Sequence, residues 1–239
     1  NELGDETMHF STARKLTLAH STILETPPLE LATLASTIGY TSIDLRLHPA
    51  FPGSTYYSLV AGSVALRQMA SHLRNEGIEV NSIESFGIGR NFHASEAFSL
   101  LEAASALNAK SLTVFGDDPD AYRLTANFAR VCELALPLGL DVALQFMAWR
   151  QVASFDDALD IVMAAGQSNG SVLVDALHFC KHANKVNISV PAVDDFDPSK
   201  SHPDTCLESP ADRRTAQAPE GLAPTTSSVA SSRAYWGLL

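Results

Sequence analysis

The nine residues Ser171-Val172-Leu173-Val174-Asp175-Ala176-Leu177-His178-Phe179 decide how the rest of the chain is interpreted. A short run of β-branched and apolar residues ends abruptly in a carboxylate, and an imidazole follows three residues later. The apolar run is typical of a strand that is buried on both faces. A carboxylate at the end of such a strand is costly unless a cation, a metal or several N–H donors pair with it. Asp175 is therefore either a functional group or the cap of the next helix.

The same succession of strand and helix signals recurs along the first three quarters of the chain. The expected strands are 16–20, 42–47, 78–86, 112–115, 142–146 and 172–175. Apolar residues at helical spacing separate them, with a period of roughly thirty residues, which predicts parallel strands joined by right-handed crossovers. The expected fold class is α/β, as a (β/α)₈ TIM barrel. An open doubly wound sheet is the runner-up, weakened because no dinucleotide fingerprint follows the first strand.

Helix boundaries are predicted from capping and turn residues. Thr26 and Asp118 each precede proline and are expected to begin helices. Ser154 and Asp157 have the spacing of a capping box. The GxG sequence at 87–89 is expected to form a turn, because so short a glycine pattern is a weak indicator of a phosphate loop.

Three regions are expected along the chain: an N-terminal extension at 1–14, a barrel at 15–182 and an irregular tail at 183–239. The tail loses helical periodicity and contains half of the 12 prolines. A short apolar run at 186–190 is a candidate for one further strand. Because a complete barrel needs two more strand–helix units, the barrel is expected to be incomplete or irregular in its last two units.

The composition narrows the classes of function. Hydrophobic residues make up 46% of the chain, which is typical of a globular protein. The net charge is −11 and the sequence has no cluster of Lys or Arg, which argues against nucleic-acid binding. The most apolar segment, 134–144, is interrupted by proline, glycine and aspartate, so neither a signal peptide nor a membrane span is expected. Three cysteines without CxxC spacing favour a reducing, cytoplasmic location. A small molecule is the expected partner, and a homo-oligomer is compatible with these features.

Three stretches carry a resemblance to a known family. They are Ile43-Asp44-Leu45-Arg46-Leu47, Asp141-Val142-Ala143-Leu144-Gln145-Phe146-Met147 and Val174-Asp175-Ala176-Leu177-His178-Phe179. On these residues, segment 15–180 resembles the sugar phosphate isomerase/epimerase family, the xylose isomerase-like TIM barrels that are related to family 2 apurinic endonucleases. The tail is unmatched.

The resemblance implies a divalent metal, Mn²⁺, Mg²⁺, Co²⁺ or Zn²⁺, at the carboxyl-terminal mouth of the barrel. Its family ligands are a Glu on the fifth strand, an Asp on the sixth, a His or similar group on the seventh and a Glu on the eighth. Asp175 matches the sixth-strand ligand, and His178 matches a nearby imidazole that contacts substrate or a metal. Gln145 stands at the position of the fifth-strand Glu, and nothing after residue 182 matches the other ligands. Because an amide oxygen adds no charge, a weakly bound metal or none is expected.

The implied reaction is a metal-dependent isomerisation or epimerisation, or a dehydration, of a small sugar, polyol or sugar phosphate. It proceeds by proton transfer at a carbon next to a carbonyl. Gln145 and Glu84 are the candidate catalytic residues, although an amide cannot take up a proton. Two alternatives stay open. Gln145 and the unmatched tail favour a non-catalytic or truncated relative that binds a sugar-like ligand, while the acidic charge disfavours an apurinic endonuclease.

Arg46, His20 and His178 are the candidate substrate-binding residues. Arg46 ends an apolar strand and needs an anionic partner there, which is either a substrate carboxylate or phosphate, or one of the protein carboxylates Glu84 and Asp44. His20 ends the first expected strand and is either a ligand contact or a hydrogen-bonded histidine at the edge of the core.

His178, Cys180 and His182 suggest a separate zinc site, because the two histidines are four residues apart. A zinc protease motif has Glu directly after its first His, where this chain has Phe179. The sequence identifies no fourth ligand, so this hypothesis is disfavoured.

Overall fold

The computed structural model describes residues 16–183 and 234–237, with side chains for residues 16–179. Its strands are β1 (Thr17–Leu18), β2 (Ser42–Arg46), β3 (Glu79–Gly89), β4 (Ser111–Asp117), β5 (Asp141–Gln145), β6 (Gly170–Asp175) and β7 (Ala234–Gly237). Its helices are α1 (Pro28–Ile38), α2 (Val64–Glu76), α3 (Ala94–Ala106), α4 (Ala121–Ala135), α5 (Phe155–Ala165) and α6 (Ala176–Ala183), with 3₁₀ turns η1 (His20–Ile23) and η2 (Leu136–Leu138). The expected extension at 1–14 and the strand candidate at 186–190 lie outside these residues.

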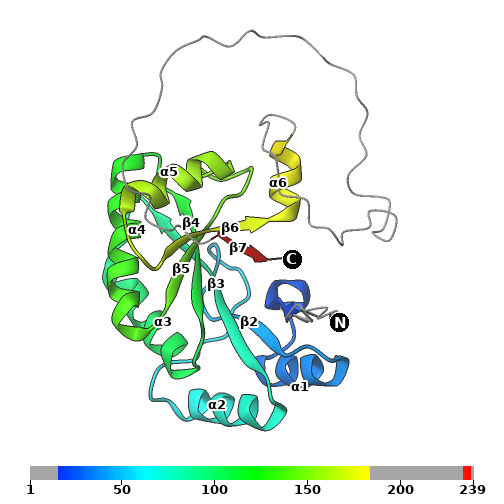
Figure 1. The fold of residues 1–239 in the computed structure, drawn as a ribbon. Coiled ribbons are helices and arrows are strands. Elements are labelled where there is room, and N and C mark those ends of the chain that lie inside the picture. Colours follow the sequence, from blue (N-terminus) through cyan, green and yellow to red (C-terminus); the bar gives the residue numbers. More distant parts are fainter. Residues whose placement is uncertain (1–15, 184–233, 238–239) are drawn as a thin grey trace, which may run out of the picture.

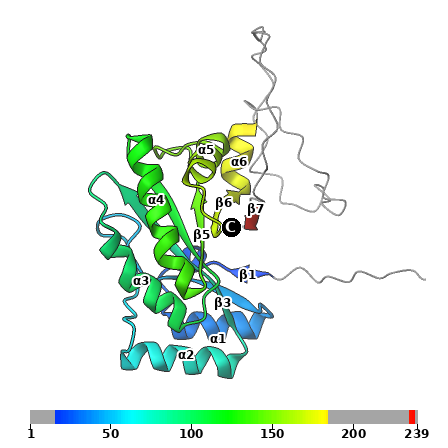
Figure 2. The same ribbon diagram turned by 60° about the vertical axis from the view of Figure 1, so that its left-hand side comes forward.

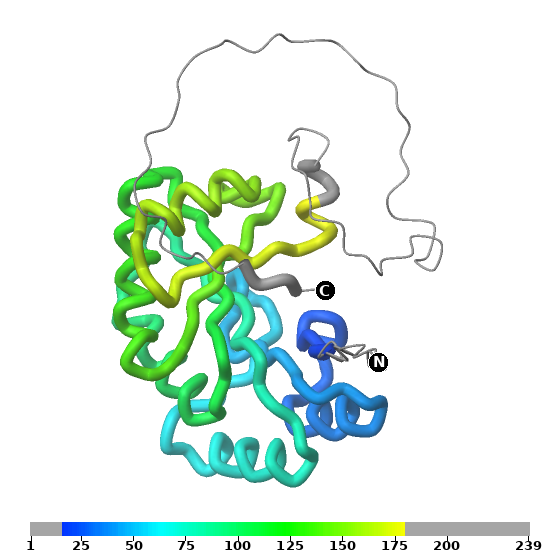
Figure 3. The backbone as a smooth tube through the Cα atoms, in the orientation of Figure 1, coloured from blue at the N-terminus to red at the C-terminus, as the bar shows by residue number. Residues whose placement is uncertain are grey.

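The strands form one parallel sheet in the order of the sequence, from β1 to β7. Figure 3 shows the order of β1 to β6 directly, because the colours from blue to yellow follow the chain around the curved sheet. Each of the helices α1 to α5 contacts the next, and all five lie on the outer side of the sheet (Figures 1 and 2). A doubly wound sheet has helices on both faces, so the runner-up fold is wrong. The described part of β1–β6 with its helices is a parallel half-barrel, as the alternating pattern predicts.

The hydrophobic core lies between the sheet and the outer helices. Strand residues that face outward are almost completely buried there, and they are Ile43, Leu45, Val80, Ile83, Leu112, Val114, Val142, Leu144, Val172 and Val174. Buried residues from the helices meet them, among them Leu31, Leu101 and Phe128. Each such side chain contributes about 1.5–3 kcal/mol of burial free energy. The core therefore fixes the outer face of β2 to β6 and leaves their concave face for other groups.

Several predicted boundaries hold and others are wrong. Ser154 and Asp157 form the predicted capping box of α5, with each side chain accepting from the other residue's backbone N–H. The cap of α1 is Pro27 rather than Thr26, and α4 is capped by Asp120 rather than Asp118. Residues 87–89 continue β3 instead of turning, because they pair with β4.

The end of the chain also differs from the irregular structure expected for 183–239. Residues Ala234–Gly237 form β7, which pairs in parallel with Val172–Asp175 of β6. No helix among the described residues is long and apolar enough to cross a membrane.

Candidate functional site

The site begins with the alternation of side chains along the strands. On β2, Ile43 and Leu45 are fully buried in the core, so Asp44 and Arg46 project from the opposite, concave face. The register pairs Arg46 with Glu84 of β3, and both residues lie toward the carboxyl ends of the β2–β3 pairing. Functional groups of parallel α/β barrels gather at this end of the strands.

The concave face is lined by hydroxyl and amide groups. The hydroxyls of Thr17 and Ser42 lie 2.6 Å apart across β1 and β2. Those of Ser82 and Thr113 lie 2.8 Å apart across β3 and β4. Bulky branched apolar side chains usually fill the interior of a TIM barrel. This half-barrel instead presents a polar surface on its inner side.

Asp44 is a partly buried carboxyl group on this polar surface. Its Oδ1 accepts a hydrogen bond of 3.0 Å from Asn81 Nδ2. Burial raises its pKa to about 7, and the nearby charge of Glu84 adds to the rise while Asn81 opposes it. Asp44 therefore keeps its proton to a much higher pH than an exposed aspartate does.

Arg46 and Glu84 form a buried ion pair, with Nη2 and Oε2 2.8 Å apart and each side chain only 9% exposed. The second carboxylate oxygen, Oε1, accepts from the backbone N–H of Ser21 at 3.1 Å. Glu84 is therefore the protein partner of Arg46, which is one of the alternatives predicted from the sequence. Arg46 Nε is buried and has no hydrogen-bond partner among the described residues.

His20 is a fully buried histidine that supports the end of β2. Its Nδ1 accepts from the backbone N–H of Arg46 at 3.1 Å, so Nε2 carries the proton and donates to the Thr26 carbonyl at 2.8 Å. Its ring stacks on Tyr57 with centroids 5.2 Å apart. Burial lowers the pKa of the imidazole, which favours this neutral form. Both ring nitrogens hydrogen-bond to backbone groups, as expected for a hydrogen-bonded histidine at the edge of the core. Neither nitrogen of His20 is left to bind a ligand.

Gln145, Asp175 and His178 meet at the ends of β5 and β6. Gln145 Nε2 donates to Asp175 Oδ2 at 3.4 Å, and His178 Nε2 lies 3.8 Å from the same oxygen. Asp175 Oδ1 accepts from the backbone N–H groups of Leu177 and His178 at 2.8 and 3.2 Å, which caps the first turn of α6. Asp175 therefore caps α6 with one oxygen, which is one of the alternatives predicted from the sequence, and its other oxygen contacts Gln145 and lies near His178.

The donors in this cluster do not by themselves fit a divalent metal. A metal site needs at least three protein donors with free lone pairs. Here one oxygen of Asp175 is used by backbone N–H groups, and Gln145 directs its NH₂ group at the other. Among the described residues, no group of three or more His, Cys, Asp or Glu side chains is placed to hold a metal ion. The side chains of Cys180 and His182, named in the zinc hypothesis, lie outside the described part.

Residues of the loop after β5 extend the site and were not predicted. Trp149 contacts the His178 ring edge-on with centroids 4.8 Å apart, and its own side chain is 64% exposed. Arg150 lies 4.3 Å above the Phe115 ring and forms an ion pair with Asp117. No local motif signals these contacts, because they join a loop to neighbouring strands only after folding.

Asp118 has a different role from the predicted one. It is 2% exposed and pairs with Arg123, whose Nε and Nη2 each lie 2.6 Å from a carboxylate oxygen. These two hydrogen bonds, helped by the more distant charge of Arg90, lower the pKa of Asp118. Asp118 therefore anchors the first turn of α4, while the neighbouring Asp120 provides the cap.

The predicted site residues thus fall into two groups on the same rim. The pair group consists of His20, Arg46 and Glu84 around β1–β3. The cluster group consists of Gln145, Asp175 and His178 on β5, β6 and α6. Within each group the residues contact one another. Strand β4, with Phe115 and Asp117, lies between the two groups.

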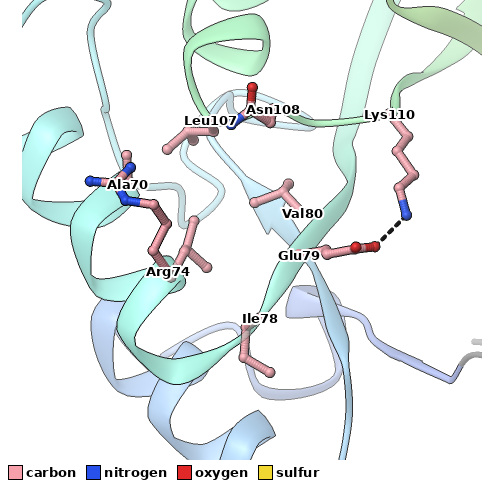
Figure 4. Close-up of a pocket in the computed structure, with 9 residues that line it drawn as sticks. Ala70, Arg74, Ile78, Glu79, Val80, Leu107, Asn108 and Lys110 are labelled. Atoms are coloured by element: carbon pink, nitrogen blue, oxygen red, sulfur yellow. Dashed lines mark hydrogen bonds and ion pairs between the residues drawn. The ribbon is translucent and has the colours of Figure 1, made fainter.

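A pocket of about 320 Å³ lies at the other end of the sheet (Figure 4). Its lining residues are Ala70, Leu73, Arg74, Ile78, Glu79, Val80, Leu107, Asn108 and Lys110. Glu79 begins β3 and Lys110 directly precedes β4, so the pocket is at the amino-terminal ends of the strands, where barrel residues chiefly serve stability. It contains none of the predicted site residues.

Comparison with known proteins identifies the fold. No family model matches the chain, and no curated protein matches it significantly. Solved structures do match. A xylose isomerase domain containing protein from Salmonella typhimurium aligns with a TM-score of 0.58 and 16% identity, over 69% of this chain and 61% of that protein. The IolI protein, solved with a bound zinc atom, aligns with a TM-score of 0.58 and 21% identity, over 73% and 66%.

A third similar structure is D-psicose 3-epimerase in the presence of D-fructose, with a TM-score of 0.56 and 13% identity, over 73% of this chain and 67% of the epimerase. The chain spans only about two thirds of the length of these proteins or slightly less. The fold of the described half-barrel is that of the xylose isomerase-like TIM barrel proteins, as the resemblance implied.

Proposed function

We propose that the chain acts on a small sugar, polyol or sugar derivative at the carboxyl ends of β2–β6, as an isomerase-type enzyme. The observation that carries this proposal is the meeting of Gln145, Asp175 and His178 on a curved parallel sheet with a polar inner face. The similar structures include a sugar epimerase and xylose isomerase domain proteins, which supports the same class of small-molecule substrate. The acidic net charge argues against a nucleic-acid substrate.

His178 is the group best suited to move a proton. It is almost fully buried beside the Asp175 carboxylate, which stabilises the imidazolium that forms when His178 takes a proton from carbon. Gln145 orients Asp175 through its amide N–H and takes no part in proton transfer. A single base returns the proton to the neighbouring carbon on the same face of an enediol. This arrangement favours aldose–ketose isomerisation over epimerisation, which requires proton delivery to the opposite face.

Glu84 has a different role in this proposal from the catalytic one expected. Both of its oxygens already accept hydrogen bonds, from Ser21 N–H and Arg46. Glu84 therefore holds Arg46 in place at the mouth, and the two side chains contact the substrate's hydroxyl groups rather than its reacting carbon.

A non-catalytic sugar-binding barrel is the second candidate, and Gln145 is the observation that favours it. An amide at this position cannot act as a base, and it hydrogen-bonds Asp175 without any ligand. In this case the same residues bind a sugar-like molecule and leave it unchanged.

Deuterium exchange separates the two candidates. The full chain is incubated with D-fructose or D-fructose 6-phosphate in D₂O, with and without Mn²⁺, and proton NMR follows exchange at the carbons next to the carbonyl. We expect exchange with the wild-type chain and its loss in His178→Asn. His72→Asn, at a partly buried histidine of α2 that hydrogen-bonds to α1, is the matched control and should exchange normally. Binding without exchange supports the second candidate, and absence of both contradicts the proposal.

A further inference from the structure

The loop after β5, residues 147–152, is closed on itself and joined to the neighbouring strand β4. The N–H of Arg150 donates to the Met147 carbonyl at 2.9 Å, and the N–H of Met147 donates to the Val152 carbonyl at 3.0 Å. The N–H of Val152 then donates to the carbonyl of Gly116, on β4, at 3.3 Å. The backbone of the loop is therefore held at a defined place beside the end of β4.

Gly116 leaves the space that this junction needs. It has the same outward parity on β4 as the core residues Leu112 and Val114. A Cβ atom at Gly116 would lie 2.5 Å from Val152 Cγ2 and 2.8 Å from Leu124 Cδ2. Carbon atoms in favourable contact are about 3.5–4.0 Å apart. Val152, which is 2% exposed, can therefore pack directly on β4 only because this position has no side chain.

Arg150 attaches the same loop to the other face of β4. Its guanidinium carbon lies 4.3 Å from the centre of the Phe115 ring, and the guanidinium forms an ion pair with Asp117. Phe115 and Asp117 have the opposite parity to Gly116, so the two attachments lie on opposite faces of the strand. The end of β4 thus fixes the loop from both sides.

Trp149 is in this loop, directly before Arg150, and burial in the core does not fix its position. Its side chain is 64% exposed, and its indole contacts the His178 ring edge-on with centroids 4.8 Å apart. An edge-on aromatic contact has a preferred geometry, so it favours one orientation of the imidazole ring. The attachments of the loop to β4 therefore determine whether the indole reaches His178.

We infer that Trp149 is a positioning residue for His178, and that Gly116 is the residue of β4 that allows this positioning. The indole holds the imidazole in the orientation that places Nε2 3.8 Å from the Asp175 carboxylate. The consequence for activity rests on the proposed function, in which His178 moves the proton, whereas the ring contact can be measured without any substrate.

Proton NMR of the full chain tests the ring contact through the Hε1 resonance of His178, which is identified by its loss in His178→Asn. Spectra are recorded at one pH well above the ordinary pKa of histidine, so that the imidazole is neutral in every variant. We expect Trp149→Ala to move the resonance, because the indole ring current is removed, and Trp149→Phe to move it less. A resonance that does not move in Trp149→Ala would overturn the inference.

Gly116→Ala tests the junction with β4. The added methyl group should displace Val152 and move the His178 resonance in the same direction as Trp149→Ala does. In the background of Val152→Ala the same change should have little further effect, because the Cγ2 atom that the methyl group meets is absent and the Leu124 side chain can change rotamer. Equal shifts in the two backgrounds would overturn the role of Gly116. Trp149→Ala alters an exposed side chain, so it tests the inference even if Gly116→Ala does not fold.

Gly89→Ala is the matched control. Gly89 is on the neighbouring strand β3, where it pairs with Asp117, and a Cβ atom there would meet nothing within 4 Å. The His178 resonance should keep its wild-type position in this variant. A shift as large as that of Gly116→Ala would mean that any methyl group at this rim disturbs the ring, and this would overturn the inference.

Deuterium exchange, followed as for the proposed function, measures the consequence for activity. Trp149→Ala should lower kcat roughly two- to tenfold and leave KM unchanged, with Trp149→Phe recovering part of the loss. A change in KM alone would assign the indole to substrate binding and would overturn its positioning role. Absence of exchange in the wild-type chain would contradict the proposed function, and the NMR shifts would still decide whether Trp149 and Gly116 position the His178 ring.

Discussion

The two groups at the rim differ in the length of their polar contacts. In the pair group, both oxygens of Glu84 and both nitrogens of His20 have partners, and backbone groups provide most of them. In the cluster group, the contacts of the Asp175 Oδ2 atom are long, at 3.4 Å to Gln145 and 3.8 Å to His178. A buried network with short contacts is rigid, whereas one with long contacts can reorganise around a ligand. In the proposed function, the pair group is therefore the fixed frame and the cluster group contains the reacting groups.

The largest expected effect comes from breaking the pair group. Arg46→Met leaves the Glu84 charge buried with only Ser21 N–H as partner, so the free energy of unfolding should fall by about 3–5 kcal/mol. Gln145→Leu in the cluster group removes one long hydrogen bond and should cost about 1 kcal/mol. Urea denaturation followed by circular dichroism measures both.

The double variant Arg46→Met/Glu84→Leu is the control for this comparison. It removes the buried charge as well as its partner, so most of the lost stability should return. A single-variant loss no larger than that of Gln145→Leu would show that the pair group is not the more rigid of the two.

The second-largest expected effect is the pH dependence of stability that Asp44 causes next to the pair group. Asp44 has a folded-state pKa of about 7 against an ordinary value near 3.8, so the folded chain holds its proton more tightly. Its contribution to stability is complete below pH 3.8 and is lost as pH rises toward 7. The amide side chain introduced by Asp44→Asn cannot ionise. The free energy of unfolding of Asp44→Asn should therefore rise relative to that of the wild type, by roughly 1–4 kcal/mol between pH 4 and pH 8.

Urea denaturation at a series of pH values measures this difference. Asp160→Asn, at an exposed position on α5, serves as the matched control and should show no comparable trend. A constant difference between Asp44→Asn and the wild type across this range would contradict the assignment of a raised pKa.

The smallest effect concerns the cluster group. Gln145→Glu places a second carboxylate beside Asp175, so without metal the stability should fall by about 1 kcal/mol through like-charge repulsion. Added Mn²⁺ should raise the melting temperature of this variant more than that of the wild type, because two carboxylates and His178 then provide a better donor set. Gln167→Glu, after the end of α5, is the control. Equal responses of the variant and the control to Mn²⁺ would contradict the prediction.

The fold was predictable where the signal is local and periodic. Apolar residues that face outward, such as Val172 and Val174, indicated the strands, and Ser154 indicated the start of α5. The strand at Ala234–Gly237 was missed because so short a segment has no periodicity to detect. The cap of α4 was misplaced by two residues because Asp118 and Asp120 have similar cap propensity, and only the contact of Arg123 with Asp118 separates their roles.

The polar residues at the strand ends could be identified from the sequence, whereas their hydrogen-bond partners could not. The polar residues at strand ends were identified because a charge after a buried strand needs a partner, and Glu84 proved to be the partner of Arg46. Trp149 and Arg150 were missed because their neighbours, His178 and Asp117, are about thirty residues away in sequence. Such contacts depend on the conformation of the loop after β5, which composition and spacing do not encode.

Strand β6 passes into α6 without a connecting residue, so Asp175 is the last residue of one element and the cap of the next. A movement of α6 along or about its axis therefore also moves the Asp175 carboxylate. Any substitution that slides or tilts α6 moves the carboxylate relative to Gln145, even when every residue of the site is unchanged. The proposed activity should accordingly be sensitive to substitutions on α6 at positions other than His178.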